Sequence, residues 1–317
     1  MATLTELVGT DCPSALTKDL VMQFGDHHDG VIEIPALTQD GGLIEVGYYY
    51  GDAKPKNIVS ISAQVGCPSQ CAFCELGTEA FGRDLTAFEM YDQVAMMLQV
   101  ASQHGIDVDA IEHKVNFAKT GEPLFNRNLV EALELISQLF LSFKVSTVFP
   151  RSAKTMKNFR NIADFASQYA KSVQIQISLI STSEECRRKL AGIPVALLSE
   201  IREAAEYWRE RNPNGRKINA SLILSEDTPC DVNDVVDILP PDLVRFRFRP
   251  CIETKNAKEH GLATMTDATI RQVKEAFADS GYKEVGDWAT PTPTEQRFGL
   301  VSNVTRRRYA EMIAGRF

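Results

Sequence analysis

The chain has 317 residues, of which 44% are hydrophobic, and its formal net charge at pH 7 is −8. That length fits two domains of average size or one of barrel size, and the hydrophobic content is sufficient for a full core. No apolar run is long enough to span a membrane and the first residues do not resemble a signal peptide, so we expect a cytoplasmic protein with no membrane partner. The acidic balance disfavours nucleic acid as a partner, because proteins that bind phosphate backbones usually carry a basic surface.

Residues 1–50 are expected to form a short N-terminal extension made of a helix and a β-hairpin. Residues 16–24 have a helical pattern. Residues 31–35 and 43–50 are expected to form two strands, and an Asp-Gly-Gly sequence between them indicates the turn.

From residue 51 to residue 255, strand and helix patterns alternate. The predicted strands span 57–64, 114–119, 143–149, 173–179, 217–224 and 244–249. The predicted helices span 86–104, 128–139, 155–170, 183–190, 196–211 and 231–237. Repeated strand–helix units predict an α/β fold in which a parallel sheet curls into a partial (βα)6 TIM-like barrel. Residues 256–317 are expected to add a C-terminal helical and capping segment, in which the Pro-broken stretch 287–298 would contact the substrate.

Three cysteines lie in a loop directly after the first predicted strand of the barrel. Cys67, Cys71 and Cys74 are separated by three residues and then by two. Three thiolates are one short of the usual shell of a [4Fe-4S] cluster or a structural zinc ion, so one metal position would stay open for a small-molecule ligand. Clustered thiols also indicate a reducing compartment. The alternative is a zinc site completed by a remote histidine, for which the chain offers His104, His113 and His260.

The spacing of these cysteines resembles the signature of the radical S-adenosylmethionine (SAM) enzymes. In that superfamily the iron without a protein ligand chelates the amino and carboxylate groups of SAM, and an electron from the cluster cleaves SAM to a 5′-deoxyadenosyl radical. The resemblance implies that Cys67, Cys71 and Cys74 hold a [4Fe-4S] cluster and that Phe73 lies near the adenine of bound SAM. It also implies an external electron donor of the flavodoxin or ferredoxin type.

Further motifs make the resemblance more specific. They are Gln64-Val65-Gly66-Cys67, Phe81-Gly82-Arg83-Asp84-Leu85-Thr86-Ala87, Gly121-Glu122-Pro123-Leu124, Ser146-Thr147 and Ser178-Leu179. Over residues 45–280 this combination is similar to the radical SAM adenine methylases of the RlmN/Cfr type. The resemblance implies that Gly121 and Glu122 meet the amino end of SAM, and that Ser146 and Ser178 bind its carboxylate or ribose.

Two departures from that family bear on function. The methylases need a methyl-carrying Cys near the C-terminus in an Ala-Cys-Gly-Gln-Leu context, whereas the corresponding residues here are 294–300 and no Cys follows Cys251. Their N-terminal RNA-binding domain is expected to be missing or reduced to residues 1–50. We therefore expect an enzyme that generates the radical but is not a typical Cys-shuttle methyltransferase.

Its substrate is expected to be a small, anionic metabolite or nucleotide, or SAM itself. An RNA-modifying, methylase-like enzyme remains the alternative, with RNA possible but disfavoured as a partner. A zinc-binding, non-catalytic protein is the second alternative.

The last predicted barrel strand alternates arginine with phenylalanine. Its two faces carry Phe246 and Phe248 on one side and Arg245, Arg247 and Arg249 on the other. If the Phe face packs on helices, the guanidinium groups point into the barrel, where they would meet an anion or acidic side chains of the wall. Arg249 is the best candidate ligand. Cys251 follows, either as a hydrogen-atom donor to a substrate radical or as a small buried hydrophobe.

Overall fold

The computed structural model describes residues 16–18, 21–26, 28–52, 57–139, 141–168, 172–282 and 286–287. These residues divide into two compact units. The first unit holds the described residues up to Cys67 and from Ala80 to Lys144, and the second holds Pro68–Glu79 and the described residues from Val145 onward. The predicted stretch 288–298 and the residues that correspond to the methylase Cys motif lie outside the described residues.

The sheet of the first unit begins with antiparallel strands and ends with a parallel pair. Its strands are β1 (Leu16–Lys18), β2 (Met22–Phe24), β3 (Gly30–Thr38), β4 (Leu43–Tyr50), β5 (Asn57–Ile61) and β8 (His113–Phe117). β3 pairs with β4 and β4 with β5, both antiparallel, and β5 pairs with β8 in parallel. The predicted hairpin is therefore confirmed.

The predicted helix over residues 16–24 is wrong. These residues form β1 and β2, which both pair antiparallel with β3. Their backbone groups find hydrogen-bonding partners along β3, and this tertiary pairing outweighs a weak local preference for helix.

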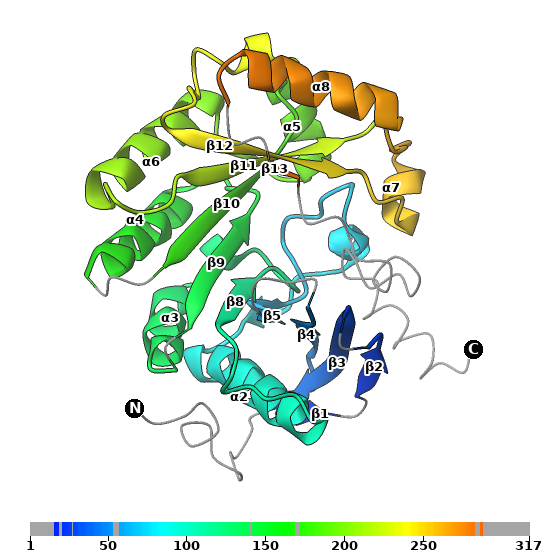
Figure 1. Cartoon of the computed structure of the whole chain (residues 1–317), viewed down its shortest axis with the longest axis vertical. Coiled ribbons are helices and arrows are strands. Elements are labelled where there is room, and N and C mark those ends of the chain that lie inside the picture. Colours follow the sequence, from blue (N-terminus) through cyan, green and yellow to red (C-terminus); the bar gives the residue numbers. More distant parts are fainter. Residues whose placement is uncertain are drawn as a thin grey trace. The chain divides into compact units, whose positions relative to one another are not determined.

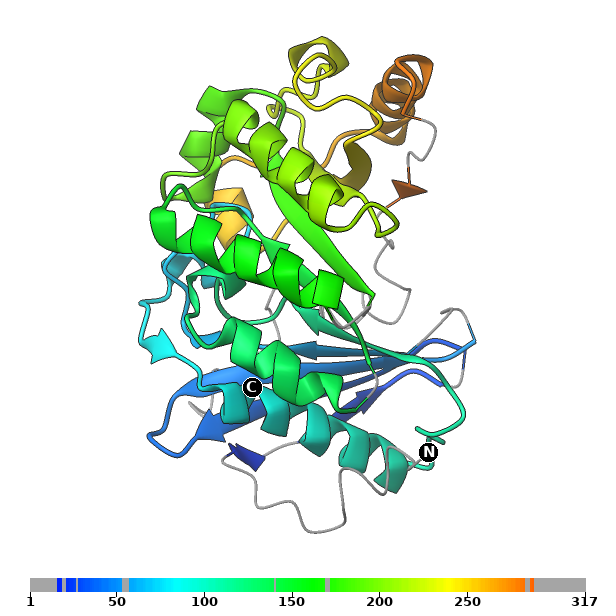
Figure 2. The same cartoon turned by 90° about the vertical axis from the view of Figure 1, so that its left-hand side faces the viewer.

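Two helices of the first unit, α2 (Ala87–Gln103) and α3 (Leu129–Ser137), lie side by side (Figures 1 and 2). α2 contacts β4 and β5. Alternate side chains of β3 and β4, among them Ile34 and Val46, are fully buried. The positions between them lie on the opposite face, as the period of a strand requires, and include the buried glutamates Glu33 and Glu45. A short antiparallel pair, β6 (Gln64–Val65) with β7 (Arg83–Asp84), and the 3-10 turn η2 (Pro123–Phe125) complete this unit.

The second unit has a parallel sheet. β10 (Val173–Ile180), β11 (Ile218–Leu224), β12 (Val244–Pro250) and β13 (Gly286–Asp287) pair in that order. β9 (Ser142–Thr147) has residues in both units. The helices of this unit are α4 (Ala153–Gln168), α5 (Glu184–Ala191), α6 (Leu198–Arg211), α7 (Lys255–Glu259) and α8 (Asp267–Asp279), with short 3-10 turns η1 (Glu75–Thr78) and η3 (Val232–Asp234). α4 and α6 contact each other (Figure 1).

The α/β fold with a mostly parallel sheet is as predicted, and all six predicted strands are present as β5, β8, β9, β10, β11 and β12. Of the six helices predicted between residues 51 and 255, only the last, at 231–237, is wrong. The side chain of Asp231 caps a single 3-10 turn there, and two prolines follow closely. None of the helices in the described ranges has the length and apolar character that a membrane crossing needs. The predicted boundaries at residues 50 and 255 stay predictions.

The packing of β12 follows its alternating sequence. The ring of Phe277 on α8 lies 4.7 Å from the ring of Phe246 and 5.1 Å from that of Phe248, measured between centroids. Both strand phenylalanines are buried, whereas the arginines between them are half-buried. The prediction that the Phe face packs on a helix is confirmed, and the guanidinium groups lie on the opposite face.

Candidate functional site

Two of the predicted metal-binding cysteines lie in the second unit, in a loop that is held tightly from outside. The amide nitrogen Nδ2 of Asn256 lies 3.0 Å from the carbonyl oxygen of Cys71, 3.2 Å from that of Ala72 and 2.9 Å from that of Cys74. The Ala72 N–H donates to the carbonyl oxygen of Leu190 at 2.9 Å. One buried amide therefore fixes the backbone that carries both thiols.

Glycines let other segments approach this loop closely. Gly192 has a φ of +71°, and a Cβ atom there would meet the carbonyl oxygens of Ser69 and Gln70. A Cβ on Gly77 would lie 2.5 Å from the carbonyl oxygen of Cys71. Gln70 itself has a φ of +46°, which is rare for a residue other than glycine. Such strain in a tightly held loop fits a site whose shape is set in advance for a ligand.

Cys67 and the Gly121-Glu122 turn both belong to the first unit, where they are linked through Gln64. The N–H groups of Ala63 and Gln64 donate to the carbonyl oxygen of Thr120 at 2.8 and 3.1 Å, and the Glu122 N–H donates to Gln64 Oε1 at 2.8 Å. Gly121 has a φ of +106°, and a Cβ there would lie 2.6 Å from Gln64 Cβ. Only glycine therefore fits at this position without strain.

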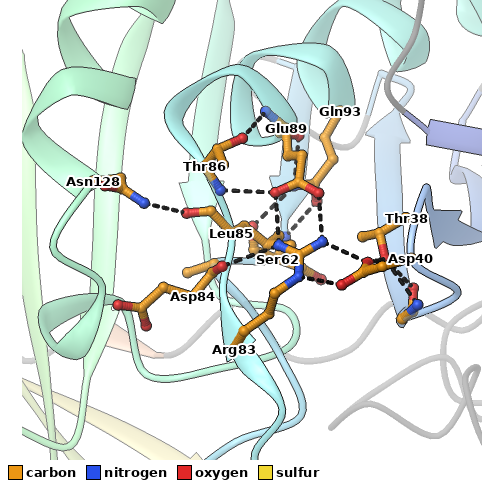
Figure 3. A network of polar contacts seen from close by, with 12 residues as sticks. Thr38, Asp40, Ser62, Arg83, Asp84, Leu85, Thr86, Glu89, Gln93 and Asn128 are labelled. Atoms are coloured by element: carbon orange, nitrogen blue, oxygen red, sulfur yellow. Dashed lines mark hydrogen bonds and ion pairs between the residues drawn. The ribbon is translucent and has the colours of Figure 1, made fainter.

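Arg83 holds the chain segment that follows the cysteine loop (Figure 3). Its guanidinium group donates to Asp40 at 2.7 Å and to Glu89 at 2.8 and 2.9 Å. Glu89 also accepts from the Thr86 N–H, and Thr86 accepts from the Glu89 N–H, which forms a capping box at the start of α2. This motif therefore has a structural role, because it joins the β3–β4 turn to the first turn of α2.

The two serines of the resemblance lie on neighbouring strands of the second unit. Ser146 on β9 has a buried hydroxyl that finds no hydrogen-bonding partner in the described part of the chain. Ser178 on β10 is half-buried. A buried hydroxyl that lacks a partner costs free energy, so Ser146 is suited to bind a polar ligand group. Both roles stay predictions.

Phe73, Cys74 and Cys251 pack in the same apolar cluster as Cys71, together with side chains that include Ile180 and Leu190. Burial raises the pKa of the Cys251 thiol to about 11. The Cys251 thiol therefore keeps its proton at neutral pH. Arg249 lies on the polar face of β12, in register with Ile223 of β11.

Two of the three histidines named for the zinc alternative, His113 and His260, make other contacts. His113 Nε2 lies 2.7 Å from the Tyr48 hydroxyl, and burial lowers the pKa of His113 to about 4. His260 Nδ1 lies 2.8 Å from the Asn256 carbonyl oxygen. Within the described ranges, no three His, Cys, Asp or Glu side chains are gathered in a form that already suits a metal ion. The three cysteines accordingly stay predicted ligands.

Sequence reasoning missed two features around these motifs. One is Asn256, which lies far along the chain from the cysteine loop. The other is a buried cluster beside the Gly121-Glu122 turn, where Lys119 Nζ lies 2.8 Å from Glu33 Oε1 and 3.6 Å from Glu45 Oε1. The inward positions of the two glutamates in their strands were the only signal that could have revealed the cluster.

Comparisons with known proteins give relatives that are named RNA methyltransferases, although no family model matches the chain. The chain is 30% identical over 218 residues to the "probable dual-specificity RNA methyltransferase RlmN" of Thermus thermophilus, covering 64% of this chain and 58% of that protein. It is 26% identical over 239 residues to a protein of the same name from Flavobacterium psychrophilum, covering 69% and 65%. The chain thus spans less than two thirds of the length of these relatives.

Solved structures support the same fold. A radical SAM methyltransferase from Sphaerobacter thermophilus superposes with a TM-score of 0.68 at 19% identity, over 87% of this chain and 76% of that one. Streptococcus suis SuiB bound to S-adenosylmethionine superposes with a TM-score of 0.52 at 15% identity, over 73% and 50%. The chain therefore has the fold of radical SAM enzymes, and its sequence resembles the RlmN-type methyltransferases within that superfamily.

Proposed function

We propose that this protein is a radical SAM enzyme. When bound, a [4Fe-4S] cluster supplies the electron that cleaves SAM reductively to methionine and a 5′-deoxyadenosyl radical. The observation that carries the proposal is the loop of Cys71 and Cys74, whose backbone is held by the Asn256 amide and by close contact with glycines. The similarity to RlmN-type proteins over 218 residues supports it.

The chain's own residues would bind and orient the two cofactors. Thiolates of Cys67, Cys71 and Cys74 would hold the cluster, and Phe73 would contact the adenine of SAM. In the first unit the Gly121-Glu122 turn would receive the ammonium group of SAM, since Glu122 offers a buried carboxylate. In the second unit the hydroxyls of Ser146 and Ser178 would donate to its carboxylate or ribose. An external flavodoxin- or ferredoxin-like donor would supply the electron.

The substrate would be a small anionic metabolite or nucleotide, or SAM itself. The arginine face of β12 supports this, because guanidinium groups form bidentate hydrogen bonds with carboxylates and phosphates. Arg249 would bind the anionic group, and Cys251 would donate a hydrogen atom from its protonated thiol to a substrate radical. In that step the S–H bond breaks and a C–H bond forms. The thiyl radical left on Cys251 would take one electron from the external donor and one proton from solvent, which restores the thiol.

A second candidate function is modification of RNA, which the names of the similar proteins favour. A methyl transfer of the RlmN type would then need an acceptor other than a C-terminal cysteine, because no Cys follows Cys251. Binding to RNA that weakens steeply with salt would support this candidate.

Anaerobic purification followed by iron, sulfide and zinc analysis tests the proposal. We expect about four iron and four sulfide per chain, and formation of 5′-deoxyadenosine and methionine from SAM with a strong reductant. Cys71→Ala should lose the bound iron and sulfide and the cleavage of SAM. The control Cys186→Ala removes a thiol that packs against the same apolar cluster, and it should retain the iron, the sulfide and SAM cleavage. Zinc without iron and sulfide would contradict the proposal. Mass spectrometry of the products of cell extracts incubated with SAM would then identify the substrate class.

A further inference from the structure

The polar face of β10, β11 and β12 is ordered in rows that cross the three strands. The strand register places Gln176, Asn219 and Arg245 side by side in one row. The next row, nearer the C-terminal ends of the strands, holds Ser178, Ser221 and Arg247. The row of Gln176 therefore lies one step deeper along the strands than Ser178, which is a proposed SAM ligand.

Two amide groups in the deeper row have unused hydrogen-bonding capacity. Gln176 is 2% exposed and Asn219 is 5% exposed. Among the residues that the structure describes, the Nε2 atom of Gln176 and the Oδ1 atom of Asn219 have no hydrogen-bonding partner. A buried polar atom left without a partner costs about 1 to 3 kcal/mol, so two of them in neighbouring positions need a reason.

A third amide on the same strand shows that burial alone does not cause this. Gln174 lies two residues before Gln176, on the same face of β10, and is also buried. Its Nε2 atom donates to the carbonyl oxygens of Ile175 at 2.9 Å and of Lys217 at 2.8 Å. The side-chain NH2 group of Gln174 therefore has two acceptors within the protein, whereas that of Gln176 has none among the described residues.

Gln176 Nε2 is a hydrogen-bond donor and Asn219 Oδ1 is an acceptor, and this pair determines which kind of ligand group can bind to both. Neighbouring strands are separated by about 4.8 Å, so the Gln176 and Asn219 amides lie next to each other and offer a donor beside an acceptor. A carboxylate or phosphate would satisfy the donor but not the acceptor. A planar group that itself carries an acceptor beside a donor, as a nucleobase edge or a carboxamide does, would satisfy both. Arg245, next in the row, would bind an anionic group of the same molecule.

We propose that Gln176, Asn219 and Arg245 form a substrate subsite that binds the planar donor–acceptor edge of an anionic substrate, such as a nucleotide with a nucleobase or carboxamide group. This inference rests on the proposed function and deepens it by naming the substrate class. Gln176 and Asn219 would fix the orientation of the planar group, and the guanidinium group of Arg245 would fix its charge.

The binding of three probes to the anaerobically purified protein tests the inference. Adenosine monophosphate carries a nucleobase edge and a phosphate, nicotinamide mononucleotide a carboxamide and a phosphate, and ribose 5-phosphate the phosphate alone. Equilibrium dialysis is done with saturating SAM, so that the adenine site of SAM is filled. We expect at least one of the first two probes to bind about tenfold more tightly than ribose 5-phosphate, as one or two added buried hydrogen bonds provide. Whichever of these two probes binds more tightly shows whether the planar group of the substrate is a nucleobase or a carboxamide.

Matched variants assign the binding to the two open amides. Gln176→Met and Asn219→Leu keep the side-chain size, and each should remove the tenfold advantage over ribose 5-phosphate. The control Gln174→Met removes an amide whose hydrogen bonds are internal, and it should retain that advantage. Thermal unfolding of each variant shows that it is folded.

Three results would overturn the inference: equal binding of all three probes, no binding of any, or equal losses in the control and the test variants. A fall in SAM affinity of the same size as the fall in probe affinity would also overturn it, because the subsite would then belong to SAM. Failure of the proposed function is distinguishable from these, since it shows as absence of iron and of SAM cleavage in the wild-type protein, whatever the probes do.

Discussion

The ammonium group of Lys119 lies 2.8 Å from Oε1 and 3.0 Å from Oε2 of Glu33, and both side chains are buried. Glu45 shares the same ammonium group, and the Tyr49 hydroxyl donates to Glu33 at 2.8 Å. A Cβ on Gly47 would lie 2.6 Å from Glu33 Oε1, so a glycine makes room for the pair. The cluster joins the N-terminal hairpin to the residue two positions before Gly121.

This cluster places two carboxylates beside one ammonium group in a region without solvent. Burial raises the pKa of Glu33 from 4.5 to about 7, and the nearby charge of Glu45 acts in the same direction, although Lys119 opposes both. The native protein therefore binds a proton at Glu33 more tightly than the unfolded chain does. The stability that this proton provides is fully present below pH 4.5 and is lost as the pH rises to about 7.

Glu33→Gln should remove this dependence on pH. In the wild-type protein the Glu33 contribution should lower the free energy of unfolding by on the order of 2 kcal/mol between pH 5 and pH 7.5. Denaturant unfolding at both pH values should show a smaller decrease for Glu33→Gln. The control Glu203→Gln changes an exposed glutamate on α6 and should keep the wild-type decrease. Identical decreases in all three proteins would contradict the assignment to Glu33.

Lys119→Met should be strongly destabilising at neutral pH. Removing the cation leaves Glu33 and Glu45 buried near each other, and breaking a buried ion pair in this way costs about 3 to 5 kcal/mol. The double variant Lys119→Met, Glu33→Gln should recover a large part of that loss, because it also removes one of the buried charges. Denaturant unfolding measures both. If the double variant is less stable than Lys119→Met alone, the loss comes from packing and not from charge.

The sequence predicted the elements of the fold whose signal is local. The six barrel strands were evident because each is a short apolar or alternating run between turn residues, and the arginine–phenylalanine alternation of β12 determined its faces correctly. β1 and β2 escaped prediction because they are three residues long and exist only by pairing with β3. No property of residues 16–24 alone shows that pairing.

The features of the candidate site also fall into two groups, those with a local signal in the sequence and those that depend on tertiary contacts. Cys67, Cys71, Cys74 and the Gly121-Glu122 turn could be predicted because their chemistry depends on spacing within a short segment. Asn256 was missed because it acts on Cys71 and Cys74 from a position about 180 residues later in the chain. The open amides of Gln176 and Asn219 were missed because a sequence pattern shows that a residue is polar but not whether its partners are present.

Asn256→Ala should loosen the cysteine loop and weaken retention of the cluster. The substitution leaves the carbonyl oxygens of Cys71, Ala72 and Cys74 without this donor, at a cost of about 1 to 3 kcal/mol. We expect this variant to lose iron to a chelator several-fold faster than the wild-type protein does. The decrease in the absorbance of the cluster over time measures this loss. Lys255→Ala, an exposed neighbour at the start of α7, is the control and should lose iron at the wild-type rate. Equal rates for Asn256→Ala and the control would show that the amide does not position the loop.

Gly121→Ala should weaken SAM binding while leaving the iron content unchanged. The new Cβ would lie 2.6 Å from Gln64 Cβ, and the φ of +106° disfavours any side chain, so the turn has to move together with Glu122. The control Gly105→Ala also has a positive φ, +80°, but its Cβ would meet nothing within 4 Å, so it adds backbone strain without a clash. We expect the dissociation constant of SAM, measured anaerobically by equilibrium dialysis, to rise at least about tenfold in Gly121→Ala, which corresponds to about 1.4 kcal/mol, and to change little in the control. Equal SAM affinity in the two variants would mean that the Gly121-Glu122 turn does not bind SAM.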